Sequence, residues 1–147
     1  AIPVKKQPFF IPDFSKEIHY EIEIVIKINR TGKHIQEKFA HTYYDQLSIG
    51  IDFTARDIQK KLKKNGEPWE KSKAFDGSAP VGLFIEKSKF SKLNNLNFKL
   101  LVNNATKQAG NTKNMIFSID YIISYVSKFI TLKKGDLIFT KHLKNGD

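Results

Sequence analysis

Two acidic residues in the stretch EIHYEIEIVIKI (17–28) have a spacing that could bind a divalent metal ion. Glu21 and Glu23 lie two positions apart, so in an extended strand both side chains point to the same face. Same-face neighbours along a strand are roughly 6.6–7 Å apart, and two unpaired anions so placed repel each other. One explanation is a solvent-exposed face on which Lys27 or another cation pairs with them. The other is a cation such as Mg²⁺, which prefers oxygen ligands, and this explanation needs a third carboxylate from elsewhere.

Asp52 is the candidate third carboxylate, since it ends the short apolar segment SIGID (48–52). Arg56 and Gln59 follow it three residues apart, which places them on one face if the segment is helical. Taken alone, they could equally be two polar residues of a surface helix. Lys73, in EKSKAFD, would by itself be read as an ordinary surface lysine.

The elements that must position these residues form a strand-rich pattern in the first half of the chain. Alternation predicts a strand over 18–28, whose isoleucines make an apolar core face. A spacing of four between apolar residues predicts a helix over 35–47, followed by a short strand over 48–52. A second helix over 55–64 is predicted, with Thr54 and Asp57 in a capping-box arrangement and the Asn65-Gly66 pair as its end.

The second half of the chain adds three strands and one clear helix. Strands are predicted over 78–85 and 94–104, the second closed by an Asn-rich turn, and a turn and strand over 132–140. A strongly amphipathic helix is predicted over 119–129, with Ser118 as its N-cap. Its expected buried stripe is Ile119, Ile122, Ile123, Val126 and Phe129. Without βαβ alternation, the pattern indicates an α+β protein rather than a doubly wound sheet.

Composition narrows the classes of protein. The 147 residues are 40% hydrophobic and 27% charged, enough for one domain with a real core. The absence of cysteine excludes disulfides and thiolate sites, and no apolar run approaches the ~20 residues of a membrane helix. The net charge of +10 comes from scattered lysines rather than a basic arm. We therefore expect neither a nucleic-acid nor a membrane partner.

Long motifs give the chain a resemblance to a known family. Stretches 19–28, 50–81 and 102–140, which include DFTARDIQ and GNTKNMIFSI, are similar to the fumarylacetoacetate hydrolase family, in its small acylpyruvase and oxaloacetate-decarboxylase type. The resemblance implies a β-rich roll of mixed sheets with two or three flanking helices, usually a homodimer. It implies that Glu21, Glu23 and Asp52 bind Mg²⁺ or Mn²⁺. It also implies that Arg56, Gln59 and Lys73 are catalytic and bind substrate together with Thr140.

Two departures from the family pattern concern the extent of the chain. Nothing before Pro8 corresponds to the segment with a catalytic His and Glu, and TKHLKNGD stands where the family has a binding loop after Thr140. The family's final strands are also lacking, and the chain begins at Ala1 without an initiator Met. We expect residues 1–147 to be a single catalytic domain of a longer protein, with mobile segments before Ala1 and between Thr140 and Lys141. The alternative is a truncated, damaged protein.

The function expected from the resemblance is metal-dependent hydrolysis of a C–C bond in an acylpyruvate, in the cytoplasm. A 2-oxo acid chelates a divalent ion, which can then stabilise the enolate left when a bond at C3 breaks. Decarboxylation of oxaloacetate and isomerisation of a 2-oxo diacid also pass through an enolate of this kind and stay open as alternatives. A non-catalytic metal-binding remnant is the third possibility.

Overall fold

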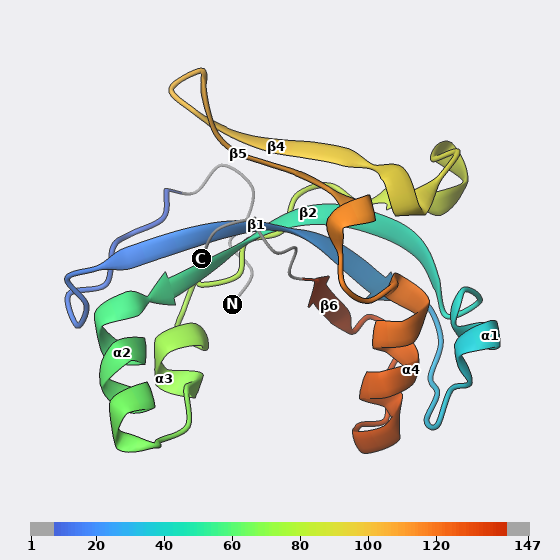
Figure 1. Ribbon diagram of the computed structural model, residues 1–147, viewed down its shortest axis with the longest axis horizontal. Helices are drawn as coiled ribbons and strands as arrows, with labels where there is room; N and C mark the ends of the chain where they lie inside the picture. Colours follow the sequence, from blue (N-terminus) through green and yellow to red (C-terminus); the bar gives the residue numbers. More distant parts are fainter. Residues whose placement is uncertain (1–7, 141–147) are drawn as a thin grey trace. The chain divides into compact units, whose positions relative to one another are not determined.

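The computed structural model describes residues 8–140, in which strands and helices follow each other irregularly (Figure 1). The strands are β1 (Ile18–Ile28), β2 (Tyr44–Ala55), β3 (Ile85–Glu86), β4 (Asn97–Val102), β5 (Ala105–Asn111) and β6 (Leu137–Thr140). The α-helices are α1 (Glu37–Ala40), α2 (Arg56–Asn65), α3 (Glu70–Lys73) and α4 (Ile119–Phe129). No helix within 8–140 is long and apolar enough to cross a membrane.

One sheet has the strand order β3-β2-β1-β6, and β4 and β5 make a second, two-stranded sheet. β6 pairs antiparallel with β1, with Ile26 opposite Ile138, and β3 pairs antiparallel with β2. The β4–β5 hairpin turns at Asn103 and Asn104, whose φ angles are 50° and 62°. Asn tolerates this left-handed backbone, which gives a two-residue hairpin the twist of its strands. The Asn-rich turn is confirmed, but β5 was not predicted.

The described chain divides into two compact units, residues 8–22 with 50–82 and residues 23–49 with 83–140. In the first unit α2 follows directly from β2 and contacts α3 (Figure 1). Its predicted end is confirmed, because Gly66 adopts a left-handed φ of 67° and donates its N–H to the carbonyls of Leu62 and Lys63. The predicted cap is wrong: Ala55 is the N-cap residue and makes no side-chain capping bond.

In the second unit α4 packs beside α1 (Figure 1). Ser118 is the N-cap as predicted, and its hydroxyl accepts a hydrogen bond from the N–H of Tyr121 at 3.0 Å. The buried stripe is narrower than predicted, since Phe129 is 68% exposed. Ser127 is fully buried instead, and its hydroxyl accepts the N–H of Ile35 at 2.9 Å. The unit's core includes the fully buried Val25, Ile26 and Ile28 of β1.

Two predicted elements are wrong. The predicted helix over 35–47 shrinks to α1, because the N–H of Tyr43 closes a turn on Ala40 and the chain then extends as β2. Phe39, expected on the buried face of that helix, is 52% exposed. The predicted strand over 78–85 is a single bridge between Gly50 and Val81, followed by the short β3.

Candidate metal and substrate site

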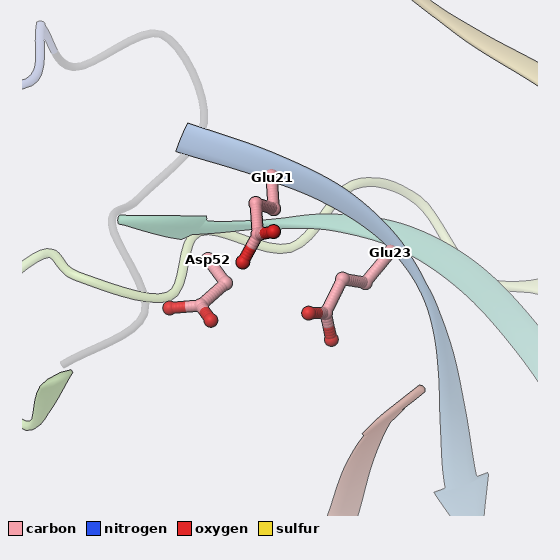
Figure 2. A group of neighbouring side chains, drawn as sticks. All are labelled: Glu21, Glu23 and Asp52. Atoms are coloured by element: carbon pink, nitrogen blue, oxygen red, sulfur yellow. The ribbon is translucent and has the colours of Figure 1, made fainter. Parts of the chain in front are cut away.

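Three carboxylates converge as the metal-site prediction requires. Glu21 and Glu23 project from one face of β1, and Asp52 projects from β2, its neighbour in the sheet order (Figure 2). Each residue offers one carboxylate oxygen, and these oxygens all lie within 4.8 Å of one another. The sequence predicted that Asp52 ends a short strand. Asp52 instead lies within the 12-residue β2, which fixes its backbone.

A fully solvent-exposed face on which Lys27 pairs with the carboxylates does not fit this geometry. Glu23 is only 5% exposed and Val25, on the same face, is fully buried. The Lys27 ammonium donates to Gln46 Oε1 at 3.3 Å and lies over the Phe84 ring. Unit charges 4 Å apart interact by about 4 kcal/mol at an effective dielectric constant of 20, so carboxylates gathered at this range repel one another.

The oxygen donor set fits a hard divalent cation. Carboxylate oxygens are the ligands that Mg²⁺ and Mn²⁺ prefer, and a site with three of them leaves positions for water or substrate. A cation of charge +2 among the three would replace repulsion by attraction. The residues present are therefore able to hold the metal that the family resemblance implies.

Lys73 lies beside the carboxylate of Asp52. From α3 its ammonium donates to Asp52 Oδ2 and, at 2.6 Å, to Thr54 Oγ1. Both side chains of the ion pair are partly buried, with Lys73 32% and Asp52 23% exposed. The Thr54 hydroxyl thus accepts a hydrogen bond from Lys73 and does not cap α2. The ammonium of Lys73 places a positive charge next to the carboxylate cluster.

Arg56 and Gln59 lie one helical turn apart at the start of α2, as predicted. Gln59 is 5% exposed, and its Oε1 accepts a hydrogen bond from Arg56 Nη1 at 2.6 Å. A guanidinium can bind a carboxylate through two parallel hydrogen bonds, so its orientation decides what it can recognise.

Thr140 lies in the second unit, at the end of β6. Its side chain is buried, and its hydroxyl donates to the carbonyl of Ile24 at 3.0 Å. Its role in substrate binding stays a prediction. The residues after Thr140 that differ from the family's binding loop, including Lys141 and His142, lie outside the described residues, as does any segment before Ala1.

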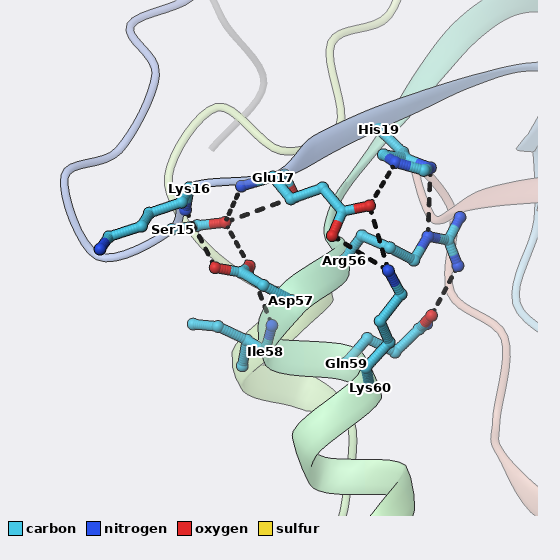
Figure 3. A network of polar contacts seen from close by, with 9 residues as sticks. All are labelled: Ser15, Lys16, Glu17, His19, Arg56, Asp57, Ile58, Gln59 and Lys60. Atoms are coloured by element: carbon cyan, nitrogen blue, oxygen red, sulfur yellow. Dashed lines mark hydrogen bonds and ion pairs between the residues drawn. The ribbon is translucent and has the colours of Figure 1, made fainter.

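One group of residues beside the site was not predicted. His19 lies near the start of β1 and Glu17 directly precedes this strand, and Lys60 extends toward Glu17 from α2 (Figure 3). The hydrogen bond from Lys60 is the main reason that the pKa of Glu17 lies below its usual value. The period of two that identified Glu21 and Glu23 also includes His19 and Glu17, so the signal was present in the sequence.

The family is shown by the match of residues 1–140 to the model of the fumarylacetoacetate (FAA) hydrolase C-terminal domain. The rat mitochondrial protein named oxaloacetate tautomerase FAHD1 is 43% identical over 133 residues, which are 90% of this chain and 60% of that protein. The Dictyostelium discoideum mitochondrial oxaloacetate decarboxylase is 40% identical over 133 residues, 90% of this chain and 61% of its own. The chain therefore spans about three fifths of the length of these relatives.

A solved structure carries the same fold. The structure of fumarylpyruvate hydrolase from Pseudomonas aeruginosa, in complex with Mn²⁺ and pyruvate, matches with a TM-score of 0.84 and 34% identity. The match covers 90% of this chain and 57% of that one. The predicted α+β class, with mixed sheets and several helices, is confirmed. The chain belongs to the fumarylacetoacetate hydrolase family.

Proposed function

We propose that the protein is a metal-dependent enzyme that acts on oxaloacetate, interconverting its enol and keto forms through an enolate. The observation that carries the proposal is the convergence of Glu21, Glu23 and Asp52 beside the ammonium of Lys73. Relatives at 43% and 40% identity have names that specify oxaloacetate. Together they support a 2-oxo diacid as the substrate.

A divalent ion held by the three carboxylates would supply Lewis acidity toward the oxygens of the 2-oxo acid. The protein's own cations act on the rest of the substrate. Lys73 places positive charge where negative charge develops at the reacting centre, and Arg56 binds a substrate carboxylate. Gln59 holds the guanidinium of Arg56 from a buried position.

Among the reactions considered, tautomerisation needs the fewest chemical steps, because it only moves a proton between C3 and the enolate oxygen. A proton leaves C3 of the keto form, the electron pair enters the C2–C3 bond, and the enolate oxygen is protonated. Acylpyruvate hydrolysis, the first expectation from the sequence, also needs an activated water. It has weaker support, because the relative named a hydrolase is 34% identical, below the two oxaloacetate enzymes.

Decarboxylation of oxaloacetate is the second candidate, favoured by the name of the Dictyostelium relative. It breaks the C3–C4 bond instead of the C3–H bond, releases CO₂ and leaves the electron pair in the enolate of pyruvate, which is then protonated at C3. The carboxylate cluster and Lys73 are therefore compatible with both reactions, and product analysis must separate them.

The test is an assay of the full-length protein with oxaloacetate and Mn²⁺ or Mg²⁺. We expect faster decay of the enol's ultraviolet absorbance without matching pyruvate formation, and we expect EDTA to abolish the effect. Pyruvate formed in step with oxaloacetate loss would replace tautomerisation by decarboxylation. Cleavage of acetylpyruvate with no effect on oxaloacetate would restore the hydrolase assignment, and undiminished activity in EDTA would rule out the metal.

A further inference from the structure

We propose that His19 is a positioning residue, which acts through Arg56 to orient the guanidinium for a substrate carboxylate. The inference rests on the substrate-binding role of Arg56 in the proposed function. It adds a residue for which the sequence suggested no role, together with the two charged residues that hold it in place.

The contacts form a continuous chain between β1 and α2 within the first unit (Figure 3). Arg56 Nε donates to His19 Nδ1 at 3.3 Å, and His19 Nε2 lies 2.9 Å from Glu17 Oε1. Lys60 Nζ donates to both oxygens of Glu17, at 3.2 and 3.1 Å. A backbone hydrogen bond joins the same two segments, since the N–H of Arg56 donates to the carbonyl of Glu17 at 2.8 Å.

Donor and acceptor chemistry fixes the direction of each bond. A guanidinium carries only donors, so His19 Nδ1 must be the acceptor and the ring proton must be on Nε2. Nε2 then donates to Glu17, which accepts because its hydrogen bond with Lys60 keeps its pKa low. Each residue therefore determines the proton position of the next, and the imidazole presents a lone pair to Arg56.

The second anchor of the guanidinium comes from Gln59. Its buried amide oxygen accepts from Nη1 at 2.6 Å, so Arg56 is held at Nε by the strand and at Nη1 by its own helix. These two bonds set the plane of the guanidinium. Nη2 can then donate to a substrate carboxylate without a change in that plane. Preorganisation of this kind lowers the entropic loss on binding, so its removal should weaken substrate binding more than turnover.

The experiment compares His19→Ala with His19→Asn in the full-length enzyme, with oxaloacetate and saturating Mn²⁺. We expect His19→Ala to raise KM roughly tenfold with kcat within about twofold, as for loss of one charge-assisted hydrogen bond. His19→Asn should recover most of the affinity, because its Oδ1 can take the place of Nδ1 as acceptor. The His19 side chain is 48% exposed, so both variants should fold. His41→Ala, at an exposed histidine of the other unit, is the matched control.

A double-mutant comparison separates this inference from the proposed function. If His19 acts through Arg56, His19→Ala should have no further effect on KM in an Arg56→Ala background. An equal rise in KM in that background, or an unchanged KM in His19→Ala alone, would overturn the role of His19 while that of Arg56 stands. An unchanged KM in Arg56→Ala would instead reject the substrate-binding role. The affinity for Mn²⁺, measured by calorimetry, should be unchanged in His19→Ala, and its loss would reassign His19 to support of Glu21.

Discussion

At the residue scale, the site combines opposite charges at short range. Asp52 belongs to the carboxylate cluster and also accepts a hydrogen bond from the ammonium of Lys73. The ammonium partly neutralises the cluster and competes for the same carboxylate that a divalent ion would bind. The charge of Lys73 should consequently favour catalysis but oppose metal binding.

Replacing Lys73 by Met separates these two effects. We expect kcat for oxaloacetate to fall roughly 10²–10³-fold, comparable to the loss of one donor that stabilises developing negative charge. The affinity for Mn²⁺ should stay the same or rise, because a like charge is removed from beside Asp52. Steady-state kinetics and calorimetry measure the two quantities. Lys71→Met, which removes an exposed lysine of the same helix, should leave both unchanged, and a normal kcat in Lys73→Met would reject its catalytic role.

At the element scale, the first turn of α2 holds the segment that precedes β1. The carboxylate of Asp57 accepts hydrogen bonds from the Ser15 hydroxyl at 2.6 Å, the Lys16 N–H at 2.9 Å and the Ile58 N–H at 2.9 Å. The hydrogen bond from Ser15 is the largest cause of a pKa for Asp57 below its ordinary value of 3.8. The fold is therefore stabilised by the ionised form of this side chain.

This shift predicts a dependence of stability on pH. Because the folded-state pKa is depressed, the stabilisation is present above about pH 3.8 and is lost as the pH falls through the folded value. The melting temperature of the wild type should fall more steeply in acid than that of Asp57→Asn, with the two curves converging at low pH. Asp76→Asn, at an exposed carboxylate of the same unit, is the control. Parallel curves for wild type and Asp57→Asn would contradict the assignment.

The N-terminus of α4 gives a second prediction at this scale. The Ser118 hydroxyl satisfies the N–H of Tyr121, one of the helix N–H groups without a partner inside the helix. Ser118→Ala should lower the free energy of unfolding by about 1 kcal/mol, and Ser118→Asp should retain the cap. Urea denaturation of both variants measures this. Equal stability of Ser118→Ala and wild type would show that the cap contributes nothing.

At the scale of the whole molecule, the net charge of +10 coexists with a local cluster of carboxylates. The overall charge affects solubility and non-specific association, whereas the binding of a cation depends on the local cluster of carboxylates. Formation of a homodimer and a cytoplasmic location stay predictions. The relatives named above include two mitochondrial proteins.

Metal binding should stabilise the whole fold, since the three carboxylates are brought together only in the folded chain. A ligand at 100 times its Kd adds about 2.7 kcal/mol to the free energy of unfolding. Mn²⁺ should therefore raise the melting temperature of the wild type clearly, and that of Asp52→Asn much less. Asp45→Asn, an exposed aspartate of the same strand, is the matched control. An equal rise in wild type and Asp52→Asn would mean that the ion binds elsewhere.

Several features with local signals could be predicted from the sequence alone. The period of two placed Glu21 and Glu23 on one face of β1, and Ser118 and Gly66 were correctly predicted to begin and end their helices. Period and capping depend on residues a few positions apart, so they can be identified without tertiary structure. The family resemblance, and the candidate metal ligands that it implies, followed from such motifs.

Features that depend on contacts between distant segments could not be predicted from local patterns. Thr54 has the residue type of a helix cap, but its hydroxyl accepts from Lys73, 19 positions away. The apolar spacing over 35–47 is compatible with a helix, but pairing with β3 and burial of Tyr44 and Leu47 favour an extended β2. His19 gained its role from Arg56, 37 positions away, because only the folded sheet and helix bring an imidazole lone pair to a guanidinium. Local patterns determine which side chains share a face, whereas packing determines which side chains they meet.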